Sequence, residues 1–180
     1  LSGYQGSEGI GDVILDAVAR VKAANPAAVY ACDPVMGNAK SGCFVAPAIP
    51  VLLRERVVPA ADIITPNQFE LEQLTGLEVH SIEDAFRAMD ALHALGPRTV
   101  IVSSLFLPGK DGAVVIAGST LDEQEEGGSR QFCIEVPKLD GYYTGTGDLF
   151  AALTLAWMHR LPGQTRSAVR SVVSTVQAVI

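Results

Sequence analysis

Cysteine is scarce in this chain, which has three cysteines without close spacing, Cys32, Cys43 and Cys133. Such a set predicts neither a disulfide framework nor a zinc site, and we expect three reduced thiols in or near the core. No apolar run approaches the length of a membrane span, so no membrane partner is expected. Basic residues are also few: 13 Lys and Arg stand against 20 Asp and Glu, for a net charge of -7. This acidic balance disfavours nucleic acid as a partner, although local loops can still bind small phosphates.

The two ends of the chain are unusual. The first residues contain neither a basic nor a long apolar stretch, so we expect no signal peptide here and a cytoplasmic location. The sequence begins at Leu1 without methionine and ends at Ile180 inside an apolar periodic segment without a stop signal. We therefore expect a fragment of a longer protein. Its 180 residues, 48% hydrophobic and 18% charged, predict one partial globular domain over 1–180.

Helical and strand patterns alternate along the chain. Helices are expected at 10–21, 48–57, 68–74, 81–95, 148–159 and 169–176, and strands at 28–32, 62–65, 99–103, 113–117 and 132–136. Residues 122–129 are expected to form an exposed loop, and the three isolated histidines to lie at the surface or at helix ends. Such alternation is typical of an α/β fold with a mostly parallel sheet covered on both faces. Ligands bind such sheets at the carboxyl ends of their strands.

The strongest chemical signal is the turn Thr144-Gly145-Thr146-Gly147-Asp148, which leads into an apolar helix. Its glycines permit a tight turn and a close approach to a ligand. The helix start offers unpaired N–H groups and the positive end of its dipole, which suit a phosphate in transit. Asp148 at this position could accept a proton from an attacking hydroxyl. The alternative is an ordinary glycine turn in which Asp148 only caps a helix.

Two further segments place polar side chains after strands. In Thr65-Pro66-Asn67-Gln68-Phe69-Glu70, the three-residue spacing puts Asn67 and Glu70 on one face of a helix start. They could hold the water shell of Mg²⁺, which needs few protein ligands, or they could simply cap the helix. In Cys32-Asp33-Pro34-Val35-Met36-Gly37, Asp33 ends a buried strand and points to the ligand edge, unless it only begins a loop.

These segments, in this order, resemble the pyridoxal kinases of the ribokinase-like superfamily, most strongly over 57–76 and 145–157. The resemblance also covers 1–4, 32–37 and 100–104, and it looks closer to the eukaryotic type than to bacterial relatives. It implies an incomplete ribokinase-like three-layer α/β/α sandwich. The implied activity is ATP-dependent phosphorylation of the 5′-hydroxymethyl group of pyridoxal, pyridoxine and pyridoxamine. The implied cofactors are ATP and Mg²⁺ or another divalent cation. The resemblance also allows a monovalent cation. A homodimer is implied for the full-length protein.

The resemblance also implies roles for single residues. Asp148 matches the catalytic base and contacts the substrate, and Tyr4 matches an aromatic residue beside the pyridine ring. The remaining matches fall into three groups. The anion hole is Gly145, Thr146 and Gly147; the ATP and Mg²⁺ positions are Asp33, Asn67 and Glu70; the other nucleotide positions are Thr65, Ser103 and Ser104.

The chain departs from the pattern at Asn38, where relatives of this type usually carry an acidic residue, so metal binding is expected to be weaker. The opening part of the family, which supplies most contacts to the vitamin, is missing. Two alternatives stay open. One is another ribokinase-like kinase, acting on hydroxymethylpyrimidine or a sugar. The other is a non-catalytic truncated chain.

Overall fold

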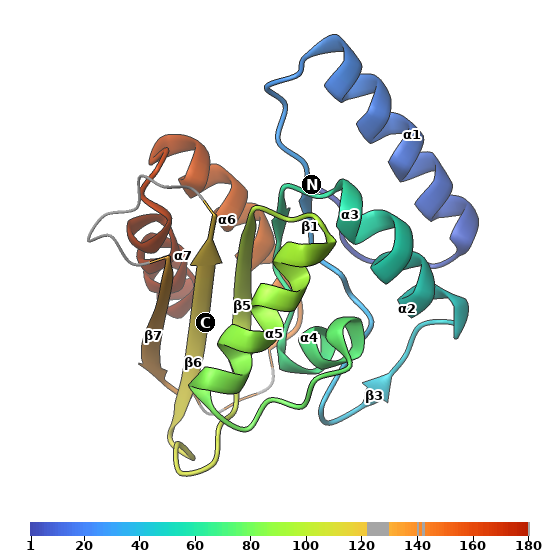
Figure 1. Ribbon diagram of the computed structural model, residues 1–180. Helices are drawn as coiled ribbons and strands as arrows, with labels where there is room; N and C mark the ends of the chain where they lie inside the picture. The colour runs from blue at the N-terminus through green and yellow to red at the C-terminus, as the bar shows by residue number, and fades with distance from the viewer. Residues whose placement is uncertain (122–129, 140, 142, 180) are drawn as a thin grey trace.

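A five-stranded sheet forms the centre of the protein, seen here in a computed structural model that describes residues 1–121, 130–139, 141 and 143–179 (Figure 1). The strand order is β1-β4-β5-β6-β7. Strands β1 (Ala31–Cys32), β4 (Ile63–Ile64) and β5 (Thr99–Leu105) run parallel, and Ser2 extends this order through a parallel bridge to Cys32. Strands β6 (Ala113–Thr120) and β7 (Gln131–Pro137) continue the sheet antiparallel. A separate small hairpin pairs β2 (Gly37–Asn38) with β3 (Gly42–Cys43).

Helices cover both faces of the sheet, which gives the expected three layers (Figure 1). They are α1 (Glu8–Ala24), α2 (Ala48–Leu52), α3 (Val58–Ala60), α4 (Gln68–Thr75), α5 (Ile82–Leu95), α6 (Thr146–Arg160) and α7 (Thr165–Val179). A π-helical turn, Leu53–Val57, joins α2 to α3, so the helix expected over 48–57 runs on to Ala60. Strands β1 and β4 are shorter than the sequence predicts. The loop expected at 122–129 lies outside the described residues.

Two hydrophobic cores lie on opposite faces of the sheet because side chains alternate along each strand. On β5, Val100 and Val102 belong to the larger core, which α4 and α5 cover, whereas Ile101 belongs to the smaller one. The smaller core is closed by residues of α6 and α7, including Phe150 and Val173. Burial of this apolar area on both faces is the main stabilising contribution.

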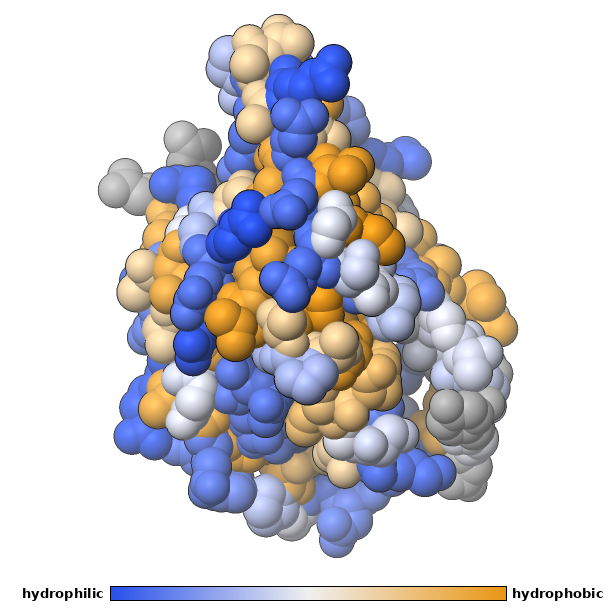
Figure 2. Space-filling view, turned by 90° about the vertical axis from the view of Figure 1, so that its right-hand side faces the viewer, coloured by the Kyte–Doolittle hydropathy of each residue, from blue (hydrophilic) through white to orange (hydrophobic). Residues whose placement is uncertain are grey.

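The apolar face of α1 is only partly buried. Ile14 and Val18 pack against the larger core, but Ile10, Val13 and Val21 are exposed. Figure 2 shows hydrophobic side chains at the surface on this side of the molecule, interleaved with hydrophilic ones. The periodicity therefore predicts the helix correctly but not the burial of its whole stripe.

His93 lies in the last turn of α5, at a helix end as expected, but it is buried. Its ring nitrogens lie 2.7 Å from the Pro97 carbonyl oxygen and 2.9 Å from Ser119 Oγ. All three cysteines are free, as expected, but the expectation that all of them lie in or near the core is wrong: only Cys32 is buried, and Cys43 and Cys133 are exposed. Among the described residues, no helix is both long and apolar enough to cross a membrane.

Candidate active site

Three adjacent parallel strands end at the same edge of the sheet and bring four of the predicted residues there. Asp33 follows β1 and Thr65 follows β4, while Ser103 and Ser104 lie near the end of β5. The pairing of β5 with β6 shifts register between Val102 and Leu105, so the two serines occupy a bulge. A bulge turns side chains out of the regular ladder. Ser103 is fixed there by its N–H, which donates to the Pro66 carbonyl at 2.9 Å.

The turn before α6 has the geometry of an anion site. Gly145 has a φ of 78°, a left-handed conformation that favours glycine, and it caps the helix without a side-chain acceptor. The helix begins at Thr146, so the first-turn N–H groups of Thr146, Gly147 and Asp148 have no side-chain cap. These groups and the helix dipole give the turn a positive potential. Asp148 itself is exposed in this first turn.

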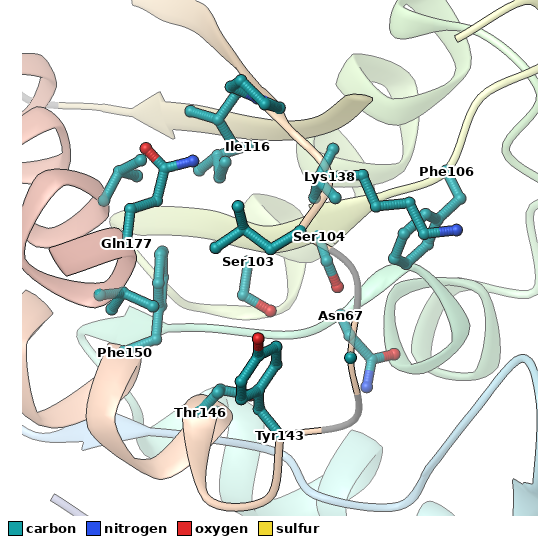
Figure 3. Close-up of a pocket in the computed structure, with 18 residues that line it drawn as sticks. Asn67, Ser103, Ser104, Phe106, Ile116, Lys138, Tyr143, Thr146, Phe150 and Gln177 are labelled. Atoms are coloured by element: carbon teal, nitrogen blue, oxygen red, sulfur yellow. The ribbon is translucent and has the colours of Figure 1, made fainter. Parts of the chain in front are cut away.

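A cavity of about 450 Å³ connects this turn to the bulge of β5. Figure 3 shows the hydroxyl groups of Ser103 and Tyr143 directed into the space between β5 and the start of α6, with Asn67 at its edge. Phe150 and Gln177 lie at one end of the cavity. The wall is formed by Asn67, Ser103, Ser104, Phe106, Val114, Ile116, Val136, Pro137, Lys138, Leu139, Gly141, Tyr143, Thr146, Gly147, Phe150, Val173, Val176 and Gln177.

The cavity has a polar end and an apolar end. Asn67, Thr146 and Gly147 mark the polar end, and Ile116 and Phe150 belong to the apolar wall. Lys138 is the one charged side chain among the described lining residues, and its Nζ lies 5.6 Å from the centre of the Phe106 ring. A volume of this size, an apolar wall and a few polar groups are typical of a small-molecule site.

Three carboxylates gather behind the polar end. Burial, together with the negative charges of Glu70 and Asp148, raises the pKa of Asp33 to about 7. Burial also raises the pKa of Glu70 to about 7, against the lowering effect of backbone N–H groups around it. No lysine, arginine or histidine among the described residues pairs with any of these carboxylates. A cation would therefore be attracted to this place.

A bound divalent metal would find few free protein oxygens here. The described part of the chain holds no group of three His, Cys, Asp or Glu arranged to bind a metal ion. Both oxygens of Glu70 accept backbone hydrogen bonds, from Met36 and from Asn67. Mg²⁺ usually keeps several waters and needs only one or two carboxylates. Asp33, with no hydrogen bond to its carboxylate among the described residues, fits such an ion best.

The predicted residues are thus divided between the cavity and its surroundings. Asn67, Ser103, Ser104, Thr146 and Gly147 line it. Asp33 adjoins it, since Asp33 Oδ2 lies 3.8 Å from the position that a Cβ on Gly147 would take. Thr65 is buried with an unpaired hydroxyl, and Glu70 is buried beside Met36. Tyr4 is 59% exposed and does not line the cavity.

Several lining residues are missing from the sequence-based prediction. Phe106 and Lys138 follow the ends of β5 and β7, and Val173 and Gln177 lie on α7, all outside the recognised motifs. Periodicity places Val173 on the apolar face of a helix, but it cannot distinguish the wall of a cavity from a packed core. Lys138 directly follows β7. Its position after the end of a strand could have marked it as a candidate ligand-binding residue.

Comparison with known proteins identifies the family. Residues 10–180 match the family model described as phosphomethylpyrimidine kinase. The chain belongs to this family. It is 53% identical over 176 residues to the pyridoxal kinase PdxY of Leifsonia xyli, covering 98% of this chain and 60% of the relative. It is 40% identical to the pyridoxal kinase of Homo sapiens, covering 100% of this chain and 60% of the relative. The predicted resemblance to pyridoxal kinases is confirmed, but the bacterial relative is more similar than the human one, against our expectation.

Solved structures confirm the fold. A pyridoxal kinase of Leishmania donovani in complex with ADP and pyridoxamine superposes with a TM-score of 0.88 at 30% identity, over 99% of this chain and 61% of that one. The complex of the same enzyme with ADP and pyridoxine gives the same TM-score and identity over 99% and 62% of the two chains. The predicted α/β fold class is therefore correct. The chain spans about 60% of the length of the relatives it matches.

Proposed function

We propose that the protein takes part in ATP-dependent phosphorylation of pyridoxal and related vitamers at the 5′-hydroxymethyl group. The observation that carries this proposal is the cavity that joins the uncapped start of α6 to an apolar wall. A nucleotide needs such a pair of environments, because its base is flat and largely apolar while its phosphates are charged. Relatives that bind ADP together with pyridoxamine or pyridoxine support the choice of both ligands.

In this proposal the first turn of α6 stabilises the phosphoryl group that is transferred. The N–H groups of Thr146 and Gly147 donate to its oxygens, as in other anion-binding helix starts. The apolar wall around Phe150 and Ile116 holds the base. Lys138 neutralises negative charge near the mouth of the cavity. Positioning and charge neutralisation supply most of the catalysis in phosphoryl transfer.

Asp148 is the proposed general base. Its carboxylate is exposed and stands in the first turn of α6, next to the anion site. Asp33 is the carboxylate that would hold Mg²⁺ through its water shell, and a bound ion would neutralise charge on the ATP phosphates. Tyr4, Thr65, Ser103 and Ser104 keep the roles predicted for them, with Tyr4 on the vitamin side. Mg²⁺, a monovalent cation, a homodimer and a cytoplasmic location stay predictions.

The test is formation of phosphorylated product from ATP with a panel of acceptors: pyridoxal, pyridoxine, hydroxymethylpyrimidine and ribose. We expect turnover with the pyridoxal-type vitamers and none with ribose. Preference for hydroxymethylpyrimidine would point instead to the activity named by the family model. Nucleotide binding without turnover on any acceptor would support a non-catalytic chain.

A further inference from the structure

Glu70 is buried between α4 and the loop that follows β1. Its side chain is 3% exposed. Oε1 accepts the backbone N–H of Met36 at 3.0 Å, and Oε2 accepts that of Asn67 at 2.9 Å. Both oxygens of the carboxylate are therefore bonded to the backbone, one to each of two separate segments. A buried carboxylate bonded in this way joins those segments strongly, because hydrogen bonds to a charged group are among the stronger ones.

Asn67 makes the same kind of connection from the other side. Its Oδ1 accepts the backbone N–H of Glu70 at 3.0 Å, which completes a capping box at the start of α4. Its Nδ2 donates to the Gly37 carbonyl at 2.9 Å. Together, Asn67 and Glu70 hold Met36 and Gly37 through two hydrogen bonds that come from one helix turn.

The segment held in this way has little room to move. A Cβ on Gly37 would lie 2.2 Å from the Gly42 carbonyl oxygen and 2.7 Å from the ring of Phe69. The N–H of Phe44 donates to the Met36 carbonyl at 3.0 Å, which closes the β2–β3 hairpin onto the same place. Asp33 lies just before this segment, and its carbonyl accepts the N–H of Val35 at 2.9 Å. Only Pro34 and Val35 separate Asp33 from the segment 36–44.

We propose that Asn67 and Glu70 are positioning residues, which clamp the segment 36–44 onto α4 and so fix Asp33, rather than direct ligands of a metal ion. The clamp itself is a property of the fold. Its consequence for metal and nucleotide binding rests on the proposed function, in which Asp33 faces the cation.

The clamp is tested first by amide hydrogen exchange without metal or nucleotide. We expect Glu70→Gln to speed exchange over 36–44 at least ~10-fold, since an amide group cannot accept both N–H groups. The matched control is Glu72→Gln on the same helix, whose carboxylate accepts the Val79 N–H at 3.0 Å. This control should loosen the neighbourhood of Val79 and leave 36–44 unchanged. Unchanged exchange over 36–44 in Glu70→Gln would overturn the proposal.

A second variant covers the case in which Glu70→Gln does not fold. Asn67→Ser keeps an oxygen that can cap α4 but removes the donor to Gly37. We expect faster exchange over 36–44 with α4 still protected. If the amides of 36–44 and of α4 are both as protected from exchange as in the wild type, the clamp is contradicted.

A double-mutant cycle separates positioning from direct ligation. The quantity measured is the factor by which Mg²⁺ strengthens ADP binding, in the wild type, Glu70→Gln, Asp33→Asn and the double variant. If Glu70 acts through Asp33, the single variant Glu70→Gln has a lower factor than the wild type. The double variant then differs from Asp33→Asn by less than ~2-fold. Independent, additive losses would mean that Glu70 is itself a ligand. Absence of any ADP binding by the wild type would overturn the proposed function, and the exchange experiment would still decide on the clamp.

Discussion

Asp148 and Gly3, far apart in the sequence, meet beside the candidate site: Asp148 Oδ1 lies 3.7 Å from the position that a Cβ on Gly3 would take. The extended residues at the start of the chain therefore form the wall next to the proposed base. Tyr4 follows directly and is 59% exposed. Under the proposed function, Tyr4 beside Asp148 is the residue predicted to contact the vitamin.

The role of Asp148 gives the first prediction. Asp148→Asn should lower kcat at least ~10²-fold, the usual contribution of a general base, and leave ADP affinity near normal. Steady-state kinetics and calorimetric titration measure the two quantities. Asp111→Asn, in the exposed turn before β6, is a control that should change neither. A variant at Asp148 that keeps nearly full turnover would remove the residue from the mechanism.

Filling the cavity tests where the nucleotide binds. Val176→Trp places a large ring in the apolar end, so ADP affinity should fall at least ~10-fold while the chain stays folded. Val179→Trp is the matched control, because Val179 is on the same helix and 68% exposed. Equal ADP affinities for the two variants would show that the nucleotide does not use this cavity.

Gly37 tests how tightly the β2–β3 hairpin is packed. A methyl group there would overlap the Gly42 carbonyl, so Gly37→Ala should lower the free energy of unfolding by about 1–3 kcal/mol. Gly112→Ala serves for comparison, since nothing lies within 4 Å of its Cβ position. Denaturant unfolding of the three proteins gives the values. A Gly37→Ala protein as stable as Gly112→Ala would contradict the packing seen here.

His93 makes stability depend on pH. Burial lowers its pKa below the ordinary value of 6.5, with a smaller lowering effect from Arg130 and opposing effects from the Pro97 carbonyl and Asp90. The unfolded chain therefore binds a proton at higher pH than the folded chain, and protonation below about pH 6.5 favours unfolding. Between about pH 8 and about pH 5, His93→Gln should lose less unfolding free energy than the wild type. Asp33 and Glu70 act in the opposite direction, but they are the same in both proteins. Parallel pH profiles would refute the assignment.

Local signals predicted most of the elements. Asn67 and Gly76 mark the two ends of α4, and both caps are observed, with Gly76 in the left-handed conformation. Ser81 caps α5 and Gly96 ends it, also as expected. These predictions succeed because a cap depends only on residues within one or two helical turns.

Features that depend on distant contacts could not be predicted in this way. The sequence around His93 does not predict its contact with Ser119 on β6. The cavity is assembled from β5, β6, β7, α6 and α7, and no spacing in the sequence relates Gln177 to Asn67. The spacing of Asn67 and Glu70 did place both on one helix turn and allowed a capping role, but it did not reveal that Glu70 also accepts the N–H of Met36.

The central claim is that a nucleotide binds between the start of α6 and the apolar wall of the cavity. An amide-resolved NMR titration of the 18.9 kDa chain with ADP and Mg²⁺ tests it most directly. The account predicts the largest shifts at Thr146, Gly147 and Asp148, with further shifts around Ile116 and Val173. Saturable shifts confined to another part of the surface, or no shifts at all, would contradict it.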